Sequence, residues 1–99
     1  MTVSGNTGGG ISNDGGNLTL NGSTVSGNMA GSGGGIYNYS GTATIEASTV
    51  SGNTAYIDGG GVYNYRAKLV FENVVVSDNT SGGRGGGICQ DGSGQISSE

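Results

Sequence analysis

The chain has 99 residues and a formal net charge of −4, with 24 glycines and no proline, histidine or tryptophan. This length allows one small domain, and three basic residues exclude the basic surface on which nucleic-acid binding depends. No apolar run is long enough to predict a transmembrane segment. Fewer than one residue in five is Leu, Ile, Val or Phe, but only 10% are charged, so the composition fits neither an ordinary core nor a self-repelling disordered chain.

A short motif recurs four times along the chain. It reads TVSGN at residues 2–6, 24–28 and 49–53, and VVSDN at residues 75–79. Each copy is followed by a glycine run and then by an aliphatic residue, which is Ile11, Ile36, Val62 or Ile88. The step from this aliphatic residue to the next motif valine is always the same length: Ile11 to Val25, Ile36 to Val50 and Val62 to Val76. The segment from each motif valine to the aliphatic residue after it, here called the leg, varies in length instead and is shortest in the first copy. The segment of constant length is therefore expected to be packed against its equivalents in the other repeats, and the segment of variable length is expected to form a loop.

Each repeat predicts three short strands. In the second repeat, alternating apolar and polar residues place them at Ile36–Tyr39, Thr42–Glu46 and Thr49–Ser51, while residues 29–32 and 55–58 are expected to be variable loops. Strands this short are not stable alone, but stacked repeats pair each strand with its equivalents above and below. The sequence therefore predicts an all-β fold, a right-handed parallel β-helix that forms a single-stranded solenoid of about four coils of 22–26 residues.

The constant register predicts which side chains stack along the solenoid. Four apolar columns should fill the interior: Val3/Val25/Val50/Val76, Ile11/Ile36/Val62/Ile88, Leu18/Ala43/Leu69 and Leu20/Ile45/Phe71. Two amide columns should form structural ladders at the corners: Asn6, Asn28, Asn53 and Asn79, and Asn13, Asn38, Asn64 and Gln90. In the last repeat Gln95 and Ser97 stand where apolar residues are expected, and a one-residue slip would bring Ile96 into the column.

The segments STVSGNTA and GGGVYN resemble the repeats of right-handed parallel β-helices in bacterial surface and secreted proteins. They are similar to the Gly-Gly-aliphatic and Asn repeats of chlamydial polymorphic outer-membrane proteins, and to those of pectin-lyase-fold proteins. The resemblance covers almost the whole chain and implies a location outside the cell or on its surface. Because the chain opens and closes within repeats, residues 1–99 are expected to be one β-helix segment of a longer array, with the signal and anchor outside it.

Two carboxylates and a lysine are weak candidates for catalysis. Glu46 and Glu72 share one repeat position, and Lys68 lies on the same strip. Such a group on a β-helix resembles the calcium-plus-base site of pectate-lyase-like enzymes, although a calcium site usually has more carboxylates. The alternative is a solvated face on which Lys68 relieves the repulsion between the glutamates. No metal site or cofactor is predicted, and calcium is left open.

Other residues predict surface contacts. Tyr37, Tyr39, Tyr63 and Tyr65 should form an outward two-by-two cluster that either binds glycans or only covers the strands. The outward Thr and Ser residues of the TVS motifs resemble an ice-binding array. Asp58 and Arg84 share a repeat position and predict an ion pair between loops. The lone Cys89 falls in the column of Tyr37 and Tyr63, so it should face outward, and it indicates neither a disulfide nor a metal site.

The sequence favours a non-enzymatic, adhesin-like stalk or display segment of an extracellular bacterial protein. The alternatives are part of a polysaccharide-active β-helix enzyme and an ice-binding or glycan-binding solenoid face. The expected partners are the neighbouring coils of the parent chain and glycans or a host surface.

Overall fold

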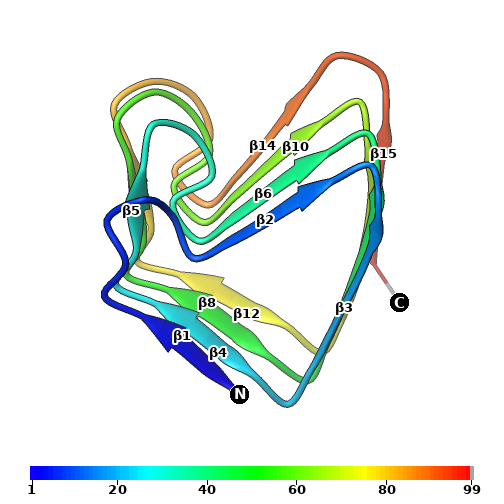
Figure 1. Ribbon diagram of the computed structural model, residues 1–99, viewed down its shortest axis with the longest axis horizontal. Helices are drawn as coiled ribbons and strands as arrows, with labels where there is room; N and C mark the ends of the chain where they lie inside the picture. Colours follow the sequence, from blue (N-terminus) through cyan, green and yellow to red (C-terminus); the bar gives the residue numbers. More distant parts are fainter. Residues whose placement is uncertain (99) are drawn as a thin grey trace.

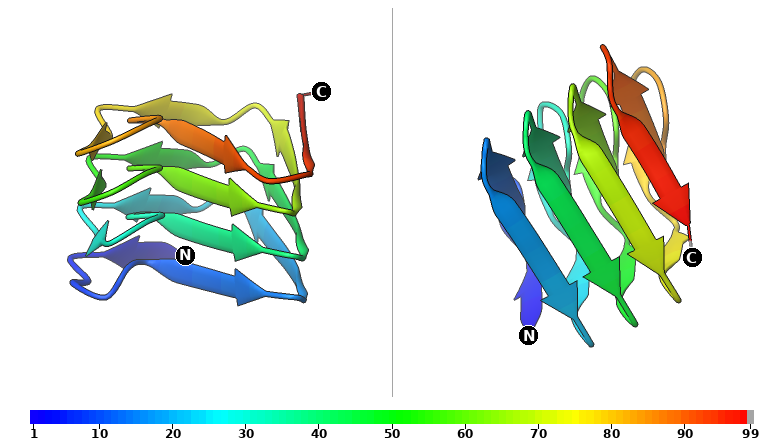
Figure 2. Two further views of the ribbon diagram at one scale, coloured as in Figure 1. Left: turned by 90° about the horizontal axis from the view of Figure 1, so that it is seen from above. Right: turned by 90° about the vertical axis from the view of Figure 1, so that its right-hand side faces the viewer.

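The computed structural model describes residues 1–98 and confirms the predicted solenoid. All regular structure in these residues is β, and every strand pairing is parallel. Seen along the stacking axis, each coil has three long sides and one looped corner (Figure 1). The chain turns clockwise as it recedes from the N-terminal coil, and the coils lie one above another (Figure 2), so the β-helix is right-handed.

Three four-stranded sheets form the long sides of the solenoid, with one strand from every coil in each sheet. The first contains β1 (Thr2–Ser4), β4 (Thr24–Ser26), β8 (Thr49–Ser51) and β12 (Val75–Ser77). The second contains β2 (Ile11–Asp14), β6 (Ile36–Tyr39), β10 (Val62–Tyr65) and β14 (Ile88–Asp91). The third contains β3 (Asn17–Asn21), β7 (Thr42–Glu46), β11 (Lys68–Glu72) and β15 (Gln95–Ser98). The three strands predicted for the second repeat are therefore confirmed.

A fourth, three-stranded sheet was not expected from the sequence. It consists of β5 (Met29–Ala30), β9 (Thr54–Ala55) and β13 (Thr80–Ser81), of which β5 and β9 overlap the segments 29–32 and 55–58 that were predicted to be loops. Each strand follows directly on a corner asparagine, and the Thr54 N–H donates a 2.8 Å hydrogen bond to the Asn28 carbonyl. A two-residue strand is too short to show alternation, so no pattern in the sequence could reveal it.

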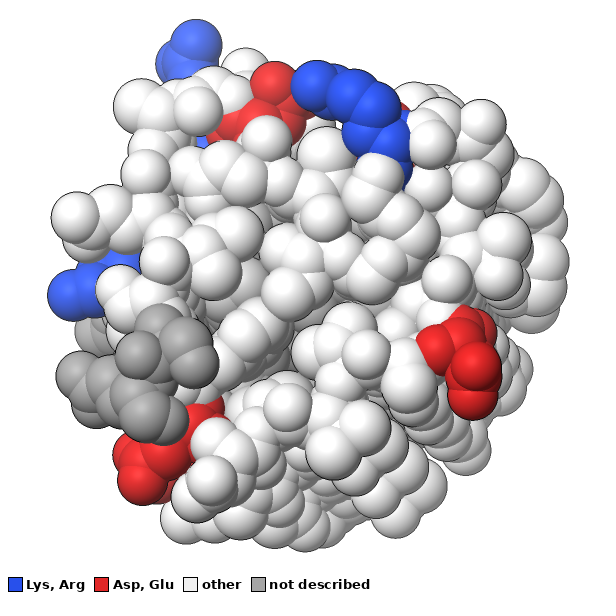
Figure 3. Space-filling view, turned by 180° about the vertical axis from the view of Figure 1, so that it is seen from behind, with Lys and Arg blue, Asp and Glu red and all other residues white. Residues whose placement is uncertain are grey.

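The interior columns have the predicted register. Val25, Ile36, Ile45, Val50, Val62 and Leu69 are completely buried, whereas Phe71 is half-buried and packs against this core from its edge. In the last coil Ile96 pairs with Leu69, which confirms the one-residue slip. The second glycine of the runs at 33–35 and 59–61 allows close stacking of the coils: a Cβ on Gly34 would lie only 2.6 Å from the Gly60 carbonyl oxygen. Viewed from behind, the molecule is mostly uncharged, with its charged side chains near the margin (Figure 3).

Candidate functional site

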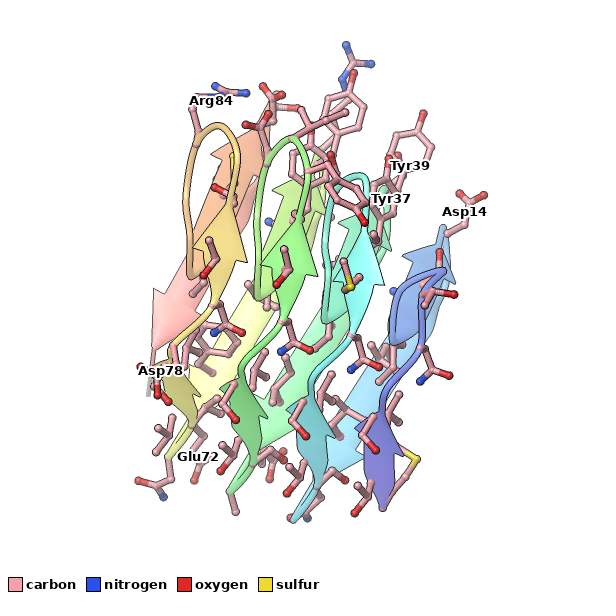
Figure 4. The ribbon with its side chains drawn as sticks, turned by 90° about the vertical axis from the view of Figure 1, so that its left-hand side faces the viewer. Asp14, Tyr37, Tyr39, Glu72, Asp78 and Arg84 are labelled. Atoms are coloured by element: carbon pink, nitrogen blue, oxygen red, sulfur yellow. The ribbon has the colours of Figure 1, made fainter. Side chains whose placement is uncertain are left out.

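Tyrosines gather on the outer face of the β2–β6–β10–β14 sheet, because residues along each strand alternate between the two faces. On β6, Ile36 and Asn38 are buried, while Tyr37 and Tyr39 point outward (Figure 4). Tyr37 and Tyr39 are in register with Tyr63 and Tyr65 of β10.

The tyrosine rings contact one another both along the stack and across it. The ring centroids of Tyr39 and Tyr65 lie 5.3 Å apart at an interplanar angle of 13°. Those of Tyr37 and Tyr63 lie 5.4 Å apart at 32°, and Tyr63 also contacts Tyr65 at 6.1 Å. The Arg66 guanidinium carbon lies 5.3 Å from the centroid of the Tyr65 ring. These contacts hold the four tyrosines in one connected cluster.

The loops that follow β5, β9 and β13 fold back over part of this face (Figure 1). As a result, Tyr63 is only 9% exposed, and a Cβ on Gly59 would come within 2.9 Å of its Cβ. Cys89 lies in the outward-facing column, as predicted, since it is in register with Tyr63. Its side chain is nevertheless buried, because the last loop passes over it at Gly85.

An ionic cluster joins two of these loops to the sheet. Arg84 Nη2 lies 3.2 Å from Asp58 Oδ2, which confirms the predicted ion pair, and 3.1 Å from Asp91 Oδ2. The Arg84 backbone N–H also donates to Asp58 Oδ1, and the Tyr63 hydroxyl donates to Asp91 Oδ2 at 2.9 Å. The roles of Asp91 and Tyr63 were missed by sequence reasoning, because they depend on the path of the loop.

The cluster shifts the pKa values of its members. Hydrogen bonds from the backbone and side chain of Arg84 lower the pKa of Asp58. The hydrogen bond from Tyr63, and then that from Arg84, lower the pKa of Asp91. Burial and the hydrogen bond to Asp91 raise the pKa of Tyr63 to about 12. Tyr63 is therefore held as a neutral hydrogen-bond donor, which suits a fastening role.

The face opens into a pocket beside the first coil. This pocket has a volume of about 240 Å³ and is lined by residues 8–12, Ala30, Ser32, Gly33 and Tyr37. It lies where the leg from the motif valine to the aliphatic residue is shortest, between Val3 and Ile11. The pocket was not found from the sequence, although the short leg was visible there.

The three candidate catalytic residues do not converge on one point. Glu46 and Glu72 are in register at the ends of β7 and β11, as expected, but Lys68 is the first residue of β11. At about 3.3 Å per residue, the Lys68 and Glu72 backbones are therefore roughly 13 Å apart. The ion pairs of the described residues are those of Arg84, and neither glutamate forms one with Lys68 there.

The asparagine columns line two corners of the solenoid as hydrogen-bonded stacks. The Nδ2 atoms of Asn6, Asn28 and Asn53 each donate to Oδ1 of the asparagine in the next coil, at 2.9–3.0 Å. In the second column Asn13 donates to Asn38, Asn38 to Asn64 and Asn64 to Gln90. A serine column that sequence reasoning missed lines the third corner: the Ser23 N–H donates to Ser48 Oγ, which donates to the Glu46 carbonyl. The Ser that precedes the second and third TVS motifs was its only signal.

The outward Thr and Ser side chains of the TVS motifs also stack in register along the β1–β4–β8–β12 sheet. Val75 interrupts the threonine column in the last coil and is 57% exposed. This face is therefore only partly hydroxylated.

Two successive stretches of the chain, residues 47–65 and 73–91, match the family model of the Chlamydia polymorphic membrane protein repeat. No curated protein and no solved structure matches the chain. Each matched stretch contains the strand of the TVS or VVS motif, the corner asparagine, the loop with its glycine run and the strand that begins with the aliphatic residue, β10 or β14. Two of the repeats of this solenoid are therefore similar to those of a bacterial surface-protein family.

The described residues contain no group of three or more His, Cys, Asp or Glu side chains that could hold a metal ion. In the same part of the chain, there is no helix long and apolar enough to cross a membrane.

Proposed function

We propose that this chain is a non-enzymatic, adhesin-like β-helical stalk or display segment of an extracellular bacterial surface protein. The observation that carries the proposal is the match of two consecutive coils to the Chlamydia polymorphic membrane protein repeat. The asparagine ladders support it, because their hydrogen bonds join each coil to the next. Coils stacked in this way form a rod whose length increases by the same amount with each repeat. In this role the coils of the parent chain are the main partners, and the looped corner carries what the rod displays.

A display segment is preferred to a polysaccharide-active enzyme because of the geometry of the polar groups. A lyase of the pectate type needs a base and a metal-binding carboxylate group around one substrate position. Here Lys68 and Glu72 stand at opposite ends of one strand. Side chains that stack in straight columns, one per coil, suit a rod better than a convergent site.

The proposal is tested on intact cells of the bacterium that carries this sequence. Antibodies raised against residues 1–99 should label unpermeabilised cells, and protease added outside should remove the epitope. A cytoplasmic protein probed in parallel controls for leakage. Labelling that appears only after permeabilisation would reject the display role.

A further inference from the structure

The first coil leaves an opening that the later coils close. Its leg between the motif valine and the aliphatic residue is the shortest of the four, and the β5–β9–β13 sheet begins only in the second coil. A loop therefore covers Tyr63 but leaves Tyr37 accessible from the side of the first coil. Figure 4 shows Tyr37 and Tyr39 on the side of the second coil that is next to the first coil, where Asp14 is labelled.

The floor and the walls of this pocket differ in chemistry. The floor is the half-buried ring of Tyr37, which packs on Tyr63 at 5.4 Å between centroids. Tyr63 is in turn fixed by its hydrogen bond to Asp91, so the ring beneath the pocket is held in place. The walls are mixed: glycines at 8–10 and 33, Ser12 and Ser32 bring polar groups, Ile11 and Ala30 are apolar, and no lining residue is charged.

An aromatic floor and uncharged walls that offer backbone groups and two serines match the two sides of a sugar ring. The C–H groups on one face of a pyranose pack against an aromatic ring, whose face carries negative charge, while the hydroxyls at its rim exchange hydrogen bonds with backbone and serine groups. The volume of about 240 Å³ is below the ~300–1,000 Å³ of pockets for drug-sized ligands, so it suits one ring. The net charge of −4 and the exposed Asp14 at the end of β2 disfavour an acidic sugar.

We infer that this pocket binds a single neutral pyranose, the terminal residue of a glycan, with its apolar face on Tyr37. Ser12 and Ser32 contact its hydroxyls from the walls. This activity goes beyond the display role, and its failure would leave that role intact. Since the contact area is small, the dissociation constant for one ring is expected to be on the order of 1 mM.

The test is a titration of the 99-residue chain by ¹H–¹⁵N NMR with methyl β-D-galactopyranoside, methyl β-D-glucopyranoside and, as a charged probe, N-acetylneuraminic acid. At least one neutral glycoside should shift the amide signals of residues 8–12 and Tyr37, and bind more tightly than the acid. N-acetyltyrosine amide is titrated in parallel, because an aromatic peptide side chain would also stack on Tyr37.

Four variants separate the contacts. Tyr37→Ser removes the floor and should weaken binding about tenfold, whereas Tyr37→Phe keeps the ring and should bind within about twofold of the parent. Gly8→Leu should abolish binding by filling the pocket, because a Cβ at Gly8 meets no atom within 4 Å and its backbone needs no glycine. Tyr56→Ser makes the same change as Tyr37→Ser on a loop residue that is 66% exposed and lies outside the pocket lining, and should have no effect.

Several results would overturn the inference. These are the absence of shifts with both neutral glycosides, unchanged binding in Gly8→Leu, tighter binding of the acid, and preference for the tyrosine amide over the sugars. If Tyr37→Ser loses its native circular dichroism, Gly8→Leu and Tyr37→Phe still decide the outcome.

Discussion

The Asn28 side-chain amide donates a 3.0 Å hydrogen bond to Oδ1 of Asn53, and both side chains are completely buried. The same oxygen accepts the backbone N–H of Asn28, and Asn53 Nδ2 donates back to the Val25 carbonyl. One side chain therefore serves polar groups in two adjacent coils, in a region that water does not reach. At this corner the strands end, and with them the regular backbone hydrogen bonds between coils. The asparagine ladder supplies hydrogen bonds between the coils in their place.

Replacing Asn53 with Ala should destabilise the fold by about 2–5 kcal/mol, because several buried polar groups lose their partner at ~1–3 kcal/mol each. Asn6→Ala is the matched control. Asn6 stands at the exposed end of the same column and should cost much less. The measurement is the urea midpoint at constant m-value. Equal losses in the two variants would mean that burial does not decide the strength of the ladder.

Val50→Asp should prevent stable folding. Val50 is completely buried between Val25 and Val76 of the neighbouring coils, so the aspartate would be an uncompensated charge in an apolar column. The control is Val75→Asp, which introduces the same residue in the next coil at a side chain that is 57% exposed. Far-ultraviolet circular dichroism and protease resistance should be lost only in the first variant. A native-like Val50→Asp protein would contradict the assignment of the interior column.

The sequence was sufficient for the features that repeat and insufficient for those that do not. The fixed spacing from each aliphatic residue to the next motif valine set the register of the long strands, so the columns of Val50 and Ile36 could be assigned before the structure. The β5–β9–β13 sheet could not be predicted, because its strands have two residues each and are too short to show an alternation of apolar and polar residues.

In the candidate site, too, some features could be predicted from the repeats and others could not. The shared repeat position of Asp58 and Arg84 predicted their ion pair, since equivalent positions stack. The burial of Tyr63 and Cys89 could not be predicted, because it follows from the path of the loops, which is set by tertiary contacts.

Gly34→Ala should destabilise the fold by about 1–3 kcal/mol or more, because the added methyl group would overlap backbone oxygens of Thr54 and Gly60 in the adjacent coil. Gly31→Ala is the control three residues earlier, where a Cβ meets no atom within 4 Å, and its effect should stay within about 0.5 kcal/mol. Thermal unfolding followed by circular dichroism measures both. If Gly34→Ala is as stable as the parent, the close stacking of the glycine runs is not needed.

Tyr63 should make stability fall at alkaline pH. Its folded pKa of about 12 lies above the ~10 of an ordinary tyrosine, so the fold holds the phenol proton more tightly than the unfolded chain does. The contribution is fully present below pH ~10 and is lost as the pH rises through about 12. Urea midpoints measured across this window should fall less steeply in Tyr63→Phe than in the parent, while Tyr56→Phe should behave as the parent. Identical slopes in all three proteins would contradict the role of Tyr63.

The two ends of the described solenoid are complementary to each other. The sheets end at β1, β2 and β3 on one side and at β12, β14 and β15 on the other. At the first edge Asn6 Nδ2 turns to the carbonyl of Ser4, whereas Nδ2 of the next asparagine in the column, Asn28, reaches the Val3 carbonyl in the coil before. A second copy stacked in register would continue the ladder from Asn79 to its Asn6, and the mostly uncharged end in Figure 3 presents little charge against it.

The isolated 99-residue chain should therefore self-associate head to tail, with an average mass that rises with concentration in sedimentation equilibrium. Ile96→Lys should suppress this association, because it places a charge in the column of Leu69 on the edge strand β15. Ile57→Lys, the same change at a loop residue that is 59% exposed, should associate as the parent does. A chain that stays monomeric at all concentrations, or equal association of the two lysine variants, would show that the strand edges do not pair.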